Sequence, residues 1–188
     1  MPRTPRFELP DGLFHVTVRG VDETSICRLD SDYERFVRLL APIGKTHAWR
    51  CQILCVMGTH YHLVVRSKIR DLADGMEALN GRYANLFNRD RGRRGHLFGR
   101  RYFAKPIETT DYLFEAIRYV ALNPVRAGIC RTPQQWRWGT YRALLGIDPA
   151  PAFIDVDGVL LQLGSTRDAG RAALREYVDG ALGFDMSA

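Results

Sequence analysis

Two histidines, His60 and His62, stand one residue apart inside an apolar run, GTHYHLVV, that spans residues 58–65. On a β-strand, residues i and i+2 project from the same face, so the two imidazoles would lie side by side. Neutral imidazole is a common metal ligand, and such a pair supplies half of a metal site. The same pattern also fits a strand whose polar residues simply face water. A third candidate ligand elsewhere in the sequence is needed to favour a metal site over a solvent-facing strand.

A later segment, DYLFEAIRYVALNPVRAG, contains candidates for the missing groups. One stripe of residues at helical spacing runs Tyr112, Ala116, Tyr119, Asn123. The neighbouring apolar stripe, which is expected to face a sheet, is Leu113, Ile117, Val120. Because Pro124 disfavours helix in the residue before it, we expect Asn123 at a fraying helix end, with its carboxamide free to turn toward a metal.

These residues together indicate phosphodiester chemistry. A tyrosine hydroxyl has a pKa of about 10 and is a weak nucleophile unaided, whereas a metal that polarises a phosphodiester compensates for this. A phosphotyrosine intermediate also conserves the bond energy, so a cut strand can be rejoined. Tyr112 is the other candidate nucleophile on the stripe. We prefer Tyr119, because Asn123 lies one turn beyond it, whereas Tyr112 is followed at that spacing by Ala116.

The net charge of the chain, +6, is concentrated in residues 89–105, RDRGRRGHLFGRRYFAK. This window has seven basic residues and one acidic residue, so the rest of the chain is balanced. A basic patch interleaved with aromatic residues fits a phosphate backbone with bases to stack on, although a solvated loop is the alternative. The residues predicted to contact nucleic acid are Arg91, Arg93, Arg94, Arg100, Arg101, Tyr102 and Lys105.

The order of predicted elements is β-α-β-β-α-β followed by a further helix. Strands are expected over residues 13–19, 49–56, 60–66 and 102–107, and helices over 32–43, 72–88 and 112–122. This order predicts an α+β, ferredoxin-like split βαβ fold, in which one antiparallel sheet carries helices on one face. Prolines at 149 and 151 predict a joint between a catalytic domain, 1–150, and a C-terminal helical extension, 151–188.

Composition narrows the class of protein. The chain has 188 residues, 46% hydrophobic and 26% charged, which is typical of a soluble globular protein. It has no apolar run long enough to span a membrane and its first residues lack the apolar core of a secretory signal, so we expect a cytoplasmic protein. Its four cysteines form no C-x-x-C pair, which argues against a disulfide framework or a zinc knuckle.

The sequence resembles the HUH-superfamily single-tyrosine transposases of insertion sequences, particularly the relatives associated with repetitive extragenic palindromes (REP). THYHLVV is similar to the HUH strand of that family, GHLFGRRYFA to its basic segment and AIRYVALNPVRAGI to its tyrosine helix. The resemblance implies that His60, His62 and Asn123 bind Mg²⁺ or Mn²⁺ and that Tyr119 is the nucleophile. Relatives often have Pro-Asn or Pro-Glu before the first histidine, whereas this chain has Gly-Thr, which bears on sequence specificity.

The resemblance implies that the protein would be a metal-dependent endonuclease and strand transferase. It would cleave single-stranded DNA beside a hairpin, at a REP-like element or an insertion-sequence end, and leave a 5′-phosphotyrosine and a free 3′-OH. Two other classes stay open: a nucleic-acid-binding module that has lost turnover, and a metal phosphoesterase that forms no covalent adduct. Relatives act either as monomers or as homodimers that exchange their tyrosine helices, and both states are compatible with the sequence.

Overall fold

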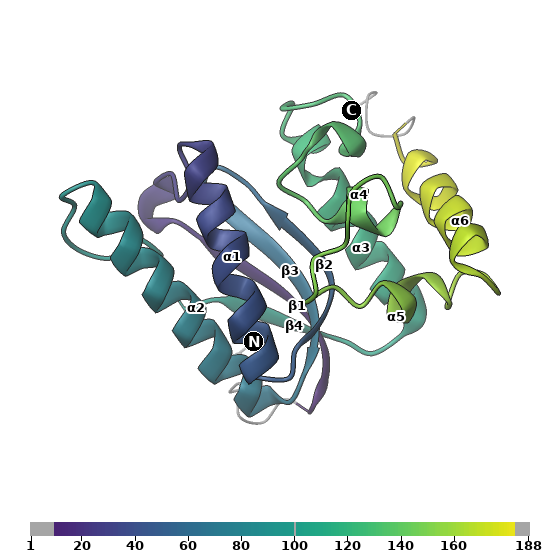
Figure 1. Cartoon of the computed structure of the whole chain (residues 1–188), viewed down its shortest axis with the longest axis horizontal. Helices are drawn as coiled ribbons and strands as arrows, with labels where there is room; N and C mark the ends of the chain where they lie inside the picture. Colours follow the sequence, from purple (N-terminus) through teal and green to yellow (C-terminus); the bar gives the residue numbers. More distant parts are fainter. Residues whose placement is uncertain (1–9, 100, 183–188) are drawn as a thin grey trace, which may run out of the picture.

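An antiparallel sheet forms the centre of the protein in the computed structural model, which describes residues 10–99 and 101–182. Within these residues its strands are β1 (Gly12–Arg19), β2 (Arg50–Val56), β3 (His60–Ser67) and β4 (Phe103–Ile107). Their order across the sheet is β2-β3-β1-β4. With α1 (Asp30–Thr46) after β1 and α2 (Ile69–Asp90) after β3, this is the predicted split βαβ arrangement (Figure 1), so the predicted fold class is confirmed.

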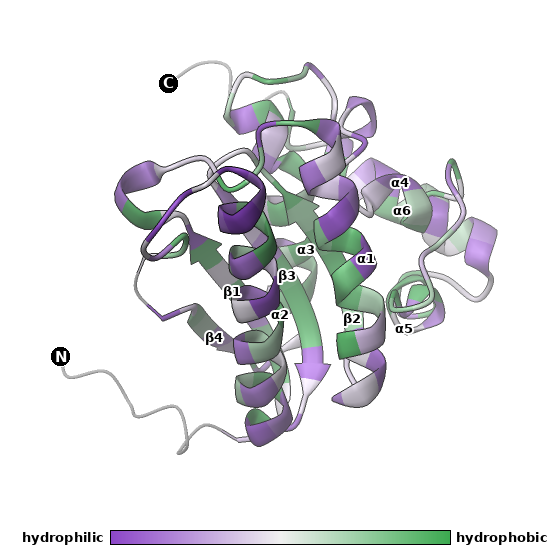
Figure 2. Ribbon diagram, turned by 60° about the vertical axis from the view of Figure 1, so that its left-hand side comes forward, coloured by the Kyte–Doolittle hydropathy of each residue, from purple (hydrophilic) through white to green (hydrophobic). Residues whose placement is uncertain are grey.

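The two faces of the sheet have different partners. On β3, the buried Tyr61 packs against Phe36 of α1, with ring centroids 4.6 Å apart, and donates a hydrogen bond of 2.7 Å to Asn80 of α2. Because side chains alternate along a strand, His60 and His62 project from the opposite face. Helices α1 and α2 therefore cover one face, where Figure 2 shows the hydrophobic strands β2 and β3 behind helices with hydrophilic outer turns.

Helix α3 (Thr110–Arg126) lies against the histidine-bearing face. The Thr109 side chain caps it by accepting a hydrogen bond of 3.2 Å from the backbone N–H of Tyr112. Its apolar stripe is buried as predicted: Leu113, Ile117, Val120. The sequence therefore predicts correctly which stripe of this helix is buried. It does not predict the side of the sheet, because helices are expected on one face and α3 lies opposite α1 and α2.

The end of α3 corrects one prediction. Asn123 does not sit at a fraying end, because the helix continues through Pro124 to Arg126. Proline lacks the N–H that would bond one turn back, but the backbone N–H groups of Ala127 and Ile129 still bond to the carbonyls of Asn123 and Pro124, both at 3.0 Å. Asn123 is consequently a buried residue of a regular helix, 8% exposed, rather than a loose terminal one.

The C-terminal part of the chain packs on the same core. It contains the 3₁₀ turn η3 (Pro133–Gln135) and the helices α4 (Tyr141–Leu144), α5 (Val156–Leu160) and α6 (Arg167–Asp179). The backbone after Pro151 joins the outer edge of β2 through bonds between Cys51 and Phe153 (3.2 Å) and between Cys51 and Asp155 (2.8 Å). The boundary at residue 150 stays a prediction. None of the described helices is long and apolar enough to cross a bilayer.

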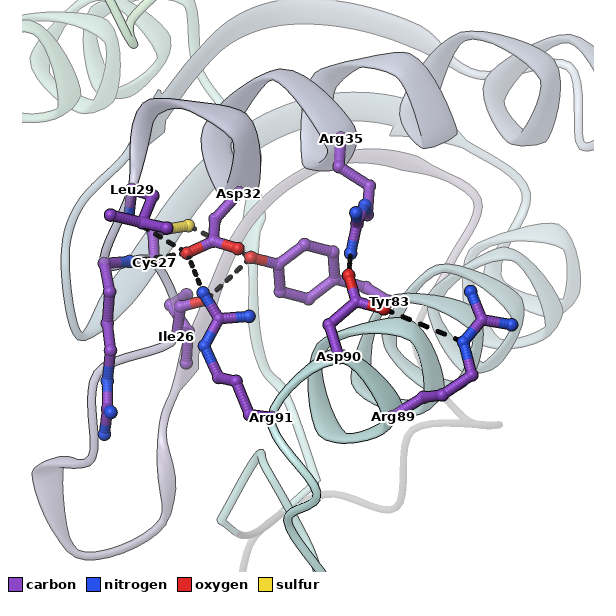
Figure 3. Close-up of polar contacts among 10 residues, drawn as sticks. Ile26, Cys27, Leu29, Asp32, Arg35, Tyr83, Arg89, Asp90 and Arg91 are labelled. Atoms are coloured by element: carbon purple, nitrogen blue, oxygen red, sulfur yellow. Dashed lines mark hydrogen bonds and ion pairs between the residues drawn. The ribbon is translucent and has the colours of Figure 1, made fainter.

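Asp32 ties the start of α1 to the segment that follows α2 (Figure 3). Its carboxylate, 3% exposed, accepts hydrogen bonds from the backbone N–H groups of Arg28 (2.8 Å) and Leu29 (3.0 Å) and from the guanidinium of Arg91 (2.6 Å). Burial by itself would raise the pKa of Asp32, but these donors outweigh it and hold the pKa below its usual value. The ionised carboxylate is therefore a structural element of this region.

We expect Asp32→Ala to lower the free energy of unfolding by about 3 kcal/mol at neutral pH, because Arg91 loses its buried counter-charge. Since folding lowers the pKa of this carboxyl, its stabilisation is present above the ordinary pKa of about 3.9 and is lost as the pH falls through the folded value. Urea unfolding should therefore show a smaller difference in the free energy of unfolding between wild type and variant at acidic pH than at neutral pH.

The matched control is Asp157→Ala, which removes a carboxylate from an exposed ion pair with Arg167 and should leave the unfolding midpoint unchanged. Equal midpoints at neutral pH for Asp32→Ala and the wild type would contradict a structural role for Asp32.

Candidate active site

His60, His62 and Asn123 meet on the α3 side of the sheet. The Nε2 atom of His60 donates to Oδ1 of Asn123 at 3.1 Å, and Nδ2 of Asn123 donates to Nε2 of His62 at 3.3 Å. The Nε2 atoms of both imidazoles thus converge on one carboxamide. The structure brings together the residues that the sequence predicted as metal ligands, and their role as ligands stays a prediction.

This donor set is suited to a divalent cation. Two imidazole nitrogens and a carboxamide oxygen are neutral ligands, so a bound cation would keep its positive charge available for phosphate oxygens. The described part of the chain has no cluster of three or more His, Cys, Asp or Glu side chains that could bind a metal. The carboxamide of Asn123 remains the predicted third donor beside the two histidines.

Burial keeps the imidazoles in the neutral form that metal binding requires. It lowers the pKa of His62 to about 3, with further contributions from the neighbouring His15, His60 and Arg19. Burial also lowers the pKa of His60, although the hydrogen bond to Asn123 opposes this shift. A neutral imidazole keeps one ring nitrogen with a free electron pair. In His62 this nitrogen is Nε2, whereas in His60 metal binding through Nε2 requires its proton to move to Nδ1, which lies 3.1 Å from Thr59 Oγ1.

Tyr119 lies beside these groups at the edge of a cleft of about 890 Å³. Its ring centroid is 5.3 Å from that of His62 and 5.7 Å from that of His15, and the residue is 38% exposed. The other tyrosine of the stripe, Tyr112, has the Lys105 ammonium 4.3 Å from its ring centroid. The geometry thus favours Tyr119 as the residue that can meet a substrate beside the histidines.

Two further side chains of this site were missed by the sequence analysis. His15 Nε2 and Thr17 Oγ1 each lie 3.1 Å from Nδ1 of His62, on the ring side away from Asn123. Both residues belong to β1, where Thr17 is paired with His62. The alternation His15, Thr17, Arg19 was visible in LFHVTVR, but only the register between β1 and β3 places it against His62.

His15 is neutral at physiological pH. Burial lowers its pKa to about 4, and the positive charge of Lys105 adds to the effect. Because Nε2 of His62 accepts from Asn123, the proton of His62 resides on Nδ1, where His15 or Thr17 accepts it. The two β1 side chains therefore fix the tautomer that leaves Nε2 of His62 free to bind a metal.

Among the residues predicted to contact nucleic acid, some are exposed to solvent and others are bonded to side chains within the protein. Arg101 is exposed and lines the cleft, Lys105 is exposed on β4 and paired with His15, and Arg94 is exposed. Arg93 donates to Oδ1 of Asn88 at 3.2 Å and is half-buried.

Three of the predicted contacts need correction or lie outside the structure. Arg91 bonds to Asp32 and stacks on Phe87, with Cζ 3.9 Å from the ring centroid, so its charge supports the fold. Tyr102 is a core residue, 9% exposed, and cannot present its ring to a base. Arg100 lies outside the described residues. The exposed aromatic residue of this segment is Phe103, which lines the cleft.

Comparisons with known proteins bear on this site. Residues 11–123 match the family model "Transposase IS200 like". A solved structure of the REP-associated tyrosine transposase bound to a REP hairpin is similar to this chain, with a TM-score of 0.64 and 16% identity over 82% of this chain and 94% of that one. At this identity the likeness shows the fold.

A second structure, a putative transposase from Deinococcus radiodurans R1, aligns with a TM-score of 0.44 and 15% identity over 63% of this chain and 95% of that one. No curated protein matches the chain. The family match extends from β1 to Asn123 and thus contains both histidines, Tyr119 and the carboxamide between the imidazoles. This chain belongs to the IS200-like transposase family.

Proposed function

We propose that the protein is a metal-dependent single-stranded DNA endonuclease and strand transferase with Tyr119 as the nucleophile. The observation that carries this proposal is the convergence of His60, His62 and Asn123 beside Tyr119. His62 and Tyr119 line a cleft that also has arginines on its walls. The similar REP-associated transposase was solved with a REP hairpin, which supports a single-stranded DNA partner that carries a hairpin, of REP type or at an insertion-sequence end.

The chemistry follows from the position of Tyr119. Its hydroxyl oxygen attacks a phosphorus atom, the bond from phosphorus to the upstream O3′ breaks, the phenol proton is lost to solvent and the O3′ takes up a proton. The products are a 5′-phosphotyrosine and a free 3′-OH, and attack by a 3′-OH on the phosphotyrosine reverses the step. Mg²⁺ or Mn²⁺ held by His60, His62 and Asn123 would polarise the phosphodiester. Arg19 and Arg101, on the cleft wall, bind flanking phosphates.

Tyr119→Phe should abolish covalent DNA–protein adducts and leave DNA binding within about twofold of wild type, because the variant lacks one oxygen and keeps the ring. The test is to incubate each protein with Mn²⁺ and labelled single-stranded DNA fragments from the regions that flank its gene. A denaturing gel then shows whether the covalent adduct has formed. Tyr112→Phe is the matched control and should still form the adduct. An adduct that survives Tyr119→Phe and disappears in Tyr112→Phe would assign the nucleophile to Tyr112 instead.

His15→Ala should weaken Mn²⁺ binding by up to about tenfold, because His62 loses one of the two acceptors that fix its tautomer and keeps only Thr17. His15→Gln restores an acceptor and should recover most of the affinity. Free Mn²⁺ can be titrated by electron paramagnetic resonance without any DNA, so the result does not depend on turnover. The control is His47→Ala, which removes a histidine at the far end of α1. Equal Mn²⁺ affinity in His15→Ala and wild type would show that His15 does not support the metal ligand.

A further inference from the structure

A second cleft, of about 410 Å³, adjoins the catalytic one. Tyr119 and His15 line both clefts, so the two spaces meet at the nucleophile. Apart from His15, the walls of the second cleft come from α3, with Ala116 at its floor between Tyr112 and Tyr119. The small side chain of Ala116 leaves this space open beside the helix.

The second cleft has the chemistry of a nucleotide site. Arg118 and Arg126 line it with a single carboxylate, Glu115, so its lining is net positive. The guanidinium of Arg126 lies 5.3 Å from the ring centroid of Tyr119, so a positive charge stands beside the proposed nucleophile. Tyr112 adds an aromatic face to the same cleft. Cationic groups beside aromatic rings are the usual means of holding single-stranded nucleic acid.

The direction of the strand follows from in-line displacement, in which the attacking and leaving oxygens lie on opposite sides of phosphorus. The upstream O3′ therefore departs on the side away from Tyr119. The downstream nucleotide keeps its O5′–phosphorus bond and so stays bonded to Tyr119 through the phosphate. The second cleft is lined by Tyr119 and other residues of the same helix, which suits the strand that stays bonded to Tyr119. The first cleft, which Arg101 lines, is then available for the departing strand.

We propose that the second cleft binds the nucleotides on the 3′ side of the cut, with Arg126 and Arg118 on their phosphates. The inference rests on the proposed function and adds to it the polarity of the DNA across Tyr119. It also gives Tyr112 a role as a wall of the binding site for the retained strand.

The test uses the full chain with Tyr119→Phe, which binds without cutting, and a fragment that wild type has been shown to cleave. One set of oligonucleotides ends progressively further downstream of the cut, and another begins progressively further upstream. Each downstream nucleotide that enters the second cleft should tighten binding and steepen the salt dependence. Arg126→Ala should reduce this gain in affinity from downstream nucleotides, since only Arg118 remains, and should lower the slope of log K against log salt by about 0.7. The gain in affinity from upstream nucleotides should be kept.

Four companion variants make the result specific. Arg126→Lys keeps the charge and should restore most of the gain. Arg101→Ala, in the first cleft, should show the opposite pattern and lose the upstream gain. Arg175→Ala removes an exposed arginine of α6 and should change neither series. Arg118→Ala serves as a second probe of the downstream cleft, although Arg118 also stacks on Tyr177 of α6.

The outcomes separate the two proposals. If wild type forms no adduct with any fragment, the proposed function fails and the inference fails with it. If wild type forms the adduct but Arg126→Ala keeps the full downstream gain, or loses only the upstream gain, the inference alone is overturned.

Discussion

The site depends on one bridging contact, the carboxamide of Asn123 between the Nε2 atoms of His60 and His62. It joins α3 to β3 and so sets where Tyr119, one turn earlier on α3, stands relative to the imidazoles. All three groups are polar and largely buried, and unpaired buried polar groups are costly. The same atoms that would bind a cation thus also satisfy one another in its absence, and the site is preorganised by the fold.

The two faces of the sheet have different roles: one forms the hydrophobic core and the other carries the candidate active site. One face presents Phe14, Val16 and Tyr61 to α1 and α2 and is fully buried, as a hydrophobic core requires. The other face presents His15, Thr17 and His62, which form a connected polar network under α3. Helix α6 packs on the outer side of α3 through Tyr177 and Phe114, whose ring centroids are 6.4 Å apart. The C-terminal extension therefore supports the helix that carries Tyr119, the proposed nucleophile.

The positive charge of the basic segment is divided between two tasks. Arg91 neutralises the buried Asp32 and holds α1 against the end of α2, whereas Arg101 faces the cleft. Further arginines around Tyr119, Arg118 and Arg126, come from α3 itself, outside the segment that carries the net charge. Charge along the sequence is therefore a poor guide to which cationic side chains face the clefts, because carboxylates and rings that are close only in the folded protein already engage some of them.

The sequence by itself determined the order of strands and helices, the shared face of His60 and His62, and the spacing of Tyr119 and Asn123, because the periods of strand and helix are local properties. The tertiary structure decided what depends on distant partners. His15 joins the site only through the register of β1 on β3, and Tyr102 enters the core while Phe103 faces the cleft. Asn123 stays helical before Pro124 because α3 is bonded beyond it and packed against the sheet, which outweighs the local preference of the residue before a proline.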